Sequence, residues 1–235
     1  FIIGCILLTL TTLVTNSFAT IGEVSITSGS AVIDRQDGDK GITVEKELDI
    51  FSYDTVKTGN GKVGIAFIDE TRVDVTEHSK LVIDEFVYDP NTKTGSLSLK
   101  ATLGTVRYAS GQIAKNSKQN VKISTPTATI AVRGTDFAMT VNEIGGSTIV
   151  LLPSCDSNGN CYVGEIEVQT DAGFVIMNQA FQATIVDTVE SKPLKPVLLD
   201  LDLDMINNLL IVSQPKEIEA GIEEEKKLKA VANAL

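Results

Sequence analysis

Two cysteines flank a short polar loop and could form a disulfide. Cys155 and Cys161 enclose the sequence Asp-Ser-Asn-Gly-Asn, and the third cysteine, Cys5, lies far away in an apolar N-terminal run. Asn158-Gly159 is typical of a tight hairpin turn, which would place both cysteines on adjacent strands. An even pair in an oxidising compartment favours a disulfide. Zinc would require further ligands, and none lies near the pair in the sequence.

Two groups of acidic and amide side chains could bind a cation. One has part of the spacing of a calcium loop: Asp156, Asn158 and Asn160. This loop lacks the downstream glutamate and is interrupted by the second cysteine, so we do not expect a calcium site. The other group would share one face of an extended segment, where a solvated acidic face is the default: Asp200, Asp202 and Asp204.

The single histidine, His78, lies in a polar turn between residues 76 and 80 and has no Ser or Cys motif beside it. The sequence therefore does not support a Ser-His-Asp or Cys-His arrangement. It also contains no phosphate-binding loop, dinucleotide fingerprint or paired zinc-ligand motif. We expect no catalytic residues, no cofactor, no metal site and no enzymatic activity.

Arg133 is the one cation in the apolar stretch STPTATIAVRGTDFAMTV, residues 124–141. Its planar guanidinium could bind a carboxylate or a phosphate group of a ligand. The alternative is structural: Arg133 pairs with an acid or caps backbone carbonyls, while Gly134 permits a bend. We favour the structural role.

The same stretch predicts a strand, a kink and a second strand. Residues alternate with a period of two from Thr127 to Arg133, and Pro126 stands at the entrance of this run, where a missing N–H is tolerated. Gly134 breaks the pattern, as at a bulge or a close backbone approach. Alternation resumes at Phe137, which we expect in the core.

Composition restricts the class of protein. The chain has 235 residues, no Trp, a formal net charge of −11 and a pI near 4.6. Its length suits one or two domains with a sizeable core, and its Val, Ile and Thr content favours strands. An acidic chain argues against nucleic acid as a partner, because phosphate binding needs basic patches.

Short alternating runs separated by turn residues continue through most of the chain. They predict an all-β domain over residues 20–190, with no convincing helix between the strands. The predicted strands cover residues 22–26, 31–33, 42–44, 48–53, 63–68, 72–76, 81–88, 96–99, 104–108, 121–124, 147–152, 164–168, 173–177 and 182–186. Three strands open on a glycine, at Gly22, Gly104 and Gly164. This recurrence is compatible with a β-solenoid-like roll, and a sandwich is equally compatible.

The two ends differ from this domain. Residues 1–14 are apolar and uncharged, and Ser17-Phe18-Ala19 resembles a signal-peptidase site, so we expect a signal peptide over residues 1–19 that is cleaved after Ala19. The alternative is an uncleaved membrane anchor. Because the chain opens with Phe1 and stops inside an apparent helix, we expect both ends to be incomplete.

The C-terminal residues predict two further segments. Pro193 and Pro196 indicate a linker, which continues into a short amphipathic helix within residues 191–214. Pro215 then begins a charged helix over residues 215–235, which we expect to be truncated. Its apolar side chains stand at roughly helical spacing: Ile218, Ile222, Leu228 and Val231. This tail either packs on the domain, binds a partner or is a solvated helix.

Four motifs occur in an order that resembles the FecR domain family. They are Thr55-Val-Lys-Thr-Gly59, Ile65-Ala-Phe-Ile-Asp-Glu-Thr71, the run TPTATIAVRGTDF at residues 125–137, and Gly164-Glu-Ile-Glu-Val168. The third resembles the family signature T-P-x-A-x-x-x-V-R-G-T-x-F through Thr125, Pro126, Ala128, Val132, Arg133, Gly134, Thr135 and Phe137. Two family glycines are missing, because Ser52-Tyr53-Asp54 replaces a Gly-Asp and Glu70 replaces the Gly of a D-G-[ST] turn.

The resemblance covers about residues 22–186 and implies a β-rich extracytoplasmic sensor or scaffold domain. In its best-known members the domain relays a signal from an outer-membrane receptor to a cytoplasmic sigma factor, through an anti-sigma segment and a transmembrane helix. No such segment precedes the domain here, so the chain is more similar to stand-alone exported members. We expect a periplasmic or secreted protein of unknown oligomeric state that contacts a protein partner in the cell envelope, and meets the membrane only through its signal segment.

Two other functions remain open. The chain could be a membrane-anchored regulator of sigma-factor signalling whose N-terminal part is missing. It could also be a surface adhesion or carbohydrate-binding protein, although the sparse aromatic residues argue against that class.

Overall fold

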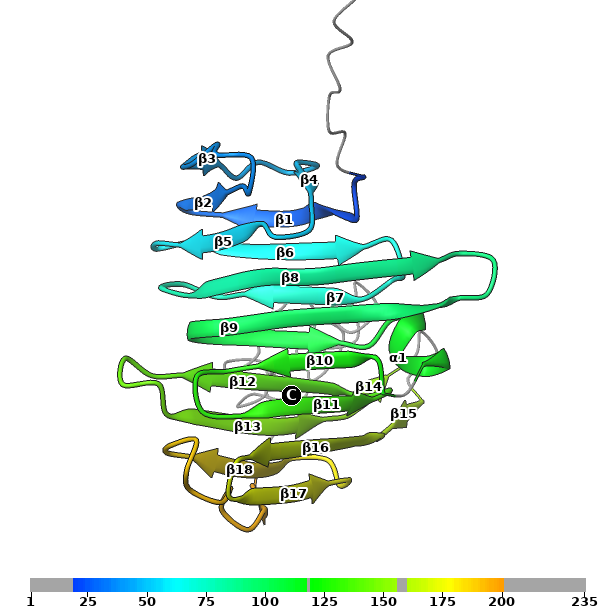
Figure 1. Cartoon of the computed structure of the whole chain (residues 1–235), viewed down its shortest axis with the longest axis vertical. Helices are drawn as coiled ribbons and strands as arrows, with labels where there is room; N and C mark the ends of the chain where they lie inside the picture. Colours follow the sequence, from blue (N-terminus) through cyan, green and yellow to red (C-terminus); the bar gives the residue numbers. More distant parts are fainter. Residues whose placement is uncertain (1–18, 118, 156–159, 201–235) are drawn as a thin grey trace, which may run out of the picture.

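The computed structural model describes residues 19–117, 119–155 and 160–200 (Figure 1). Most of these residues form strands that lie side by side along one long axis. The mainly β class predicted from the sequence is therefore confirmed. The signal segment and the two helices expected after residue 200 lie outside the described residues. Within the described residues, no helix is long and apolar enough to cross a membrane.

The strands form two layers, which we call sheet A and sheet B. Sheet A contains, in spatial order, β4 (Asp49–Ile50), β1 (Gly22–Ser28), β6 (Lys62–Phe67), β7 (Arg72–Val75), the second half of β9 (Thr94–Ala109), β12 (Asp136–Val141), β13 (Ser147–Leu152), β18 (Gln182–Val186) and β19 (Val197–Leu198). Sheet B contains β3 (Ile42–Thr43), β2 (Ala31–Asp34), β5 (Thr55–Thr58), β8 (Lys80–Asp89), the first half of β9, β10 (Val121–Ser124), β11 (Thr129–Arg133), β16 (Glu165–Thr170) and β17 (Gly173–Met177).

The order of the strands combines the two architectures that the sequence left open. Two sheets share one core, as in a sandwich, while the chain passes back and forth between them and advances steadily along the long axis, as in a solenoid (Figure 1). Neighbouring described strands are antiparallel except for β9 and β10.

The long strand β9 joins the two sheets. The sequence predicts two strands here, at residues 96–99 and 104–108, but the structure has one, which bends at Gly104 with a φ of 78°. Its first half pairs with β8 in sheet B, and its second half pairs with β7 in sheet A. The bend therefore keeps one hydrogen-bonded strand in both layers.

The core lies between the layers and is filled by the inward residues of both. Phe67 of sheet A stacks on Phe86 of sheet B with ring centroids 5.3 Å apart. Within sheet A, Tyr108 and Phe137 are fully buried and 5.5 Å apart. Phe137 thus occupies the core position that its alternation predicts. Burial of these aromatic rings is a large apolar contribution to stability.

Three further segments outside the signature differ from the sequence expectation. The loop between β9 and β10 contains the short helix α1 (Gln112–Asn116). The strand expected at residues 48–53 is only the two-residue β4, because the chain turns at residues 51–54, where Asp54 accepts a hydrogen bond from the backbone N–H of Phe51 at 3.0 Å. The segment treated as a linker, residues 191–214, contains β19, which pairs with β18.

Candidate functional site

The first part of the signature is a turn rather than the start of a strand. The strand expected to begin beside Pro126 begins at Thr129. Before it, Thr125 Oγ1 accepts hydrogen bonds from the backbone N–H groups of Thr127, at 3.3 Å, and Ala128, at 3.0 Å. Threonine hydroxyls stabilise such turns by bonding to nearby backbone groups. The alternation at residues 127–128 therefore reflects a hydrogen-bonded turn.

Buried hydroxyl groups attach this turn to sheet A. Ser147 Oγ, at the start of β13, donates a hydrogen bond to Thr125 Oγ1 at 2.7 Å and lies 2.8 Å from Thr127 Oγ1. All three side chains are buried. Because buried hydroxyls are costly without partners, this set of bonds fixes how the chain leaves β10 and enters β11.

The kink in the signature is the crossing from sheet B to sheet A. Gly134 has a φ of 68°, a left-handed conformation that glycine adopts without steric cost, and it separates β11 from β12. The backbone at the kink also contacts the fourth family motif, because a Cβ on Gly164 would lie 2.5 Å from the carbonyl oxygen of Gly134. Gly164 is therefore required for the close approach, whereas Gly134 is required for its left-handed backbone conformation.

Arg133 lies on the outer surface of sheet B and pairs with carboxylates of β16. Its guanidinium contacts Glu165, the residue opposite it in the β11–β16 register, and lies 3.8 Å from Glu167. The guanidinium is thus already paired with two acids of the chain, which supports the structural role. The ion pairs are partly exposed, and such pairs typically contribute between about 0 and 1 kcal/mol.

The larger polar cluster of the signature is centred on Asp136, the residue after Thr135. Its carboxylate accepts hydrogen bonds from Ser154 Oγ at 2.7 Å and the backbone N–H of Ser110 at 3.2 Å, and Arg107 Nη2 lies 3.5 Å away. Thr135 Oγ1 donates to the carbonyl of Leu152 at 3.2 Å. These contacts join the ends of β9, β12 and β13 to the ribbon formed by β14 (Ser154–Cys155) and β15 (Cys161–Tyr162).

Burial perturbs two carboxylates around Arg107. Desolvation raises the pKa of Asp136, against the lowering effects of the Ser154 hydrogen bond and the Arg107 charge. Desolvation also raises the pKa of Asp74, which lies opposite Arg107 in the β7–β9 register, to about 6. The Arg107 Nε is buried and has no hydrogen-bond partner. One cation thus lies close to two partly desolvated acids, and its charge lowers the pKa of both against the effect of burial.

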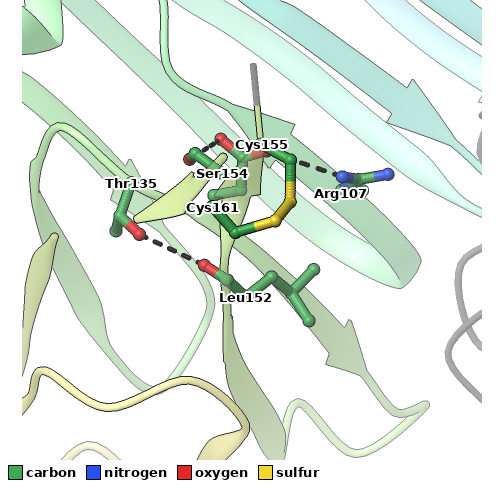
Figure 2. The surroundings of a disulfide bond; sticks show 7 residues. Arg107, Thr135, Leu152, Ser154, Cys155 and Cys161 are labelled. Atoms are coloured by element: carbon green, nitrogen blue, oxygen red, sulfur yellow. Dashed lines mark hydrogen bonds and ion pairs between the residues drawn. A yellow bond between two sulfur atoms is a disulfide. The ribbon is translucent and has the colours of Figure 1, made fainter. Parts of the chain in front are cut away.

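The predicted disulfide is confirmed. Cys155 and Cys161 are bonded with an S–S distance of 2.02 Å, and they are opposite each other in the β14–β15 ribbon. Figure 2 shows the disulfide beside Arg107 and Ser154. The bond therefore closes the ribbon that supplies the Ser154 hydroxyl to Asp136.

Most of the other candidate ligands lie outside the described residues. Of the three calcium-loop residues, Asp156 and Asn158 lie outside the described residues. Asp202 and Asp204 also lie outside them, and Asp200 is exposed. Among the described residues, no three His, Cys, Asp or Glu side chains are grouped so that they could hold a metal ion.

His78 occupies the turn between β7 and β8. Its side chain is exposed, its φ is 52°, and its backbone N–H donates to the carbonyl of Gly59 at 2.8 Å. The position therefore has a backbone role in the turn.

A buried carboxylate that positions α1 is not apparent from the sequence motifs. Asp69 is fully buried in the β6–β7 turn and accepts bonds from Thr71 N–H at 3.0 Å, Thr71 Oγ1 at 2.8 Å and the N–H of Ile113 at 3.2 Å. An Asp two residues before a Thr in a turn is a recognisable local signal. Its long-range bond to Ile113 at the start of α1 has no local signal.

Both departures from the family motifs lie at left-handed positions. Tyr53 and Glu70 stand where the family has glycine, and their φ values are 71° and 70°. A left-handed non-glycine residue costs roughly 1–2 kcal/mol. A left-handed turn conformation, which glycine adopts without steric cost, is thus formed at these two positions without glycine.

A comparison with family models gives one match on these residues: residues 54–153 match the family described as FecR protein. This match agrees with the FecR resemblance that the motifs predict. The match contains the signature, Asp69 and Asp136. The sheets of the described structure extend beyond it at both ends, from β1 to β19.

No curated protein matches the chain. Among solved structures, two crystal structures of a proposed anti-sigma factor from Parabacteroides distasonis, at 1.65 and 2.50 Å resolution, are similar to this chain with 12% sequence identity and a TM-score of 0.42. The aligned region covers 60% of this chain and 57% of that protein, so the chain spans little more than half of its length.

Proposed function

We propose that this chain is a non-enzymatic FecR-domain protein of the cell envelope that acts by protein–protein contact, as a scaffold or a sensor. The FecR match over residues 54–153 carries the proposal. The contacts of the signature residues support it, because Arg133 is paired with carboxylates of its own chain and Asp136 with hydroxyl and amide groups of its own chain. These charged residues of the signature thus form contacts that stabilise the domain itself.

Two features support an extracytoplasmic location. The disulfide fits an oxidising compartment, since such bonds rarely persist in the cytosol. The sequence Ser17-Phe18-Ala19 fits a signal-peptidase site. We propose a periplasmic or secreted protein on this basis.

An exposed sheet edge offers one way to contact a partner. Within the described residues, β17 pairs with β16 alone, and its side chains Phe174 and Ile176 are 53% and 43% exposed. Extended segments of a partner can add to such an edge through backbone hydrogen bonds.

The test is in-cell photo-crosslinking of the tagged full chain in its native host, with a photoreactive amino acid at Phe174 on the edge or at Lys122 on the outer surface of sheet B as the control. We expect a specific envelope protein crosslinked from position 174 and absent from position 122. Identical products from both positions, or localisation of the chain in the cytoplasm, would contradict the proposal.

A second candidate is regulation of sigma-factor signalling, which the family match favours. Deleting the gene distinguishes the two. A regulator of this kind changes the transcription of one sigma-dependent group of genes, and a scaffold of the envelope leaves that transcription unchanged. A third candidate, surface adhesion or carbohydrate binding, predicts retention on a glycan array and has no supporting feature among the described residues.

A further inference from the structure

The last strand of sheet B in spatial order is an open border of that sheet (Figure 1). β17 spans five residues, Gly173–Met177, and pairs with β16. Among the described residues, the other strands that end sheets A and B have only two residues each: β3, β4 and β19. β17 is therefore the end strand at which an added strand would form the most hydrogen bonds.

β17 lacks the features by which natural edge strands avoid pairing. Its sequence, GFVIM, contains no charge and no proline, and its register with β16 has no bulge. Edges are commonly protected by lysine, proline or a bulge. Phe174 and Ile176 point outward and are 53% and 43% exposed. Apart from the pairing with β16, residues 174–177 make no backbone hydrogen bond within the described structure.

The strand is complementary to a second copy of itself. An antiparallel pair of β17 strands with its twofold axis at Val175 places Phe174 opposite Ile176 of the second copy, at two symmetric positions. Aromatic and β-branched side chains stabilise paired strands when they lie opposite each other. All of residues 173–177 are paired in this register, whereas a shift of two residues would pair only 173–175 or only 175–177. A shift of one residue would bring outward residues opposite inward ones.

The charges of the neighbouring strand are compatible with this register. On β16, Glu167 lies beside Ile176, and Gln169 lies beside Phe174. Each Glu167 would therefore share an outward row with Gln169 of the second copy, three strand spacings or about 14 Å away. No like charges are brought opposite each other in these rows, although the chain has a formal net charge of −11.

We propose that two copies of this chain associate through β17, in an antiparallel pair centred on Val175 that joins their B sheets. The twofold arrangement uses the same edge of both copies and therefore closes at two. It buries Phe174 and Ile176 of both copies and pairs the open backbone groups of the edge. This inference rests on the proposed function, because it names a second copy as the partner at the exposed edge.

Sedimentation velocity of the full chain over a range of concentrations tests this pairing. Phe174→Lys combined with Ile176→Lys places lysine opposite lysine at both symmetric positions. Phe174→Glu combined with Ile176→Lys places glutamate opposite lysine, and a register centred on either substituted residue would oppose like charges instead. Val87→Lys is the matched control, because Val87 is 55% exposed on β8, where this strand pairs with β9.

We expect the unmodified chain and Val87→Lys to form a dimer with the same dissociation constant. The two-lysine variant should raise that constant at least about tenfold, because two symmetric apolar pairs are replaced by like charges. The glutamate–lysine variant should associate more tightly than the two-lysine variant. Circular dichroism should show the same β content in all of them, because both substituted side chains are half-exposed.

Three results would overturn the proposal. They are an unmodified chain that stays monomeric at every concentration, a Val87→Lys variant that associates as weakly as the two-lysine variant, and a glutamate–lysine variant that associates no better than it. A monomeric chain crosslinked from position 174 to a different envelope protein would overturn this inference and leave the proposed function standing. A dimer located in the cytoplasm would contradict the proposed function and leave the pairing intact.

Discussion

The outer surfaces of the two sheets differ in chemistry although both sheets have the same alternation of inward and outward residues. On sheet B, the ionic groups are partly exposed and paired across strands, as Arg133 is with Glu165 and Lys57 with Asp34. On sheet A, the ionic groups around Arg107 are more deeply buried and desolvated. Ion pairs on the two sheets are therefore expected to contribute differently to the free energy of unfolding, because screening by water weakens the pairs on sheet B.

The largest expected difference comes from removing one acid on each surface. Asp136→Ala leaves Ser154, Ser110 N–H and Arg107 without their acceptor, and we expect it to lower the free energy of unfolding by about 2–3 kcal/mol. Glu165→Ala, the control on sheet B, should cost less than about 1 kcal/mol. Urea unfolding monitored by circular dichroism measures both. Equal losses would show that the two surfaces do not differ in energetic terms.

Opening the disulfide should affect sheet A alone. Replacing both Cys155 and Cys161 by serine removes the closure of a short loop, which stabilises a fold by about 2 kcal/mol. We expect faster amide exchange in β12 and β13, because the ribbon holding Ser154 against Asp136 becomes looser. Amide exchange in β10 and β11 should not change. Uniform acceleration through both sheets would contradict this expectation.

The pH dependence of stability should have opposite signs on the two surfaces. Burial raises the pKa of Asp74 from 3.8 to about 6. The protonated carboxyl is therefore favoured in the folded state, and its contribution to stability is fully present below pH 3.8. This contribution is lost as the pH rises through about 6. Asp74→Asn should therefore increase the free energy of unfolding at pH 7 by about 1–2 kcal/mol.

Asp34 on sheet B provides the opposite case. The hydrogen bond from Lys57 lowers the pKa of Asp34, so its contribution is present above the unfolded pKa and is lost as the pH falls through the folded pKa. Asp34→Asn should lower stability at pH 7 and have no effect in acid. NMR titration of the carboxyl carbons gives both pKa values. A pKa of Asp74 below 4 would remove the basis of the comparison.

The smallest expected effects should be the same on both sheets. Tyr53 precedes β5 of sheet B, and Glu70 follows β6 of sheet A, and both are left-handed. Tyr53→Gly and Glu70→Gly should each raise the free energy of unfolding by about 0.5–1 kcal/mol, because the relief of steric strain exceeds the entropy that glycine adds to the unfolded chain. Thermal unfolding measures the gain. Alanine at either position keeps the strain and is the control.

Local patterns were sufficient for much of the fold. Alternation from Thr129 to Arg133 and from Phe137 to Val141 predicted both strands of the signature, and Gly134 predicted the kink between them. These features depend on side-chain periodicity and backbone sterics within a few residues. Where a side chain makes local hydrogen bonds, as Thr125 does, alternation alone placed the strand too early.

The sequence by itself determined the β class, the resemblance to the FecR family and the cysteine pair, because each is encoded in residue type and short spacing. Only the tertiary structure decided that β11 and β12 lie in different sheets, that Arg133 meets Glu165, and that Asp136 meets Ser154. These pairs come from strands distant in sequence, and their contact depends on register and on the crossing at Gly134. The contrast between the two outer surfaces has the same origin, since alternation shows which residues share a face but not which faces meet water.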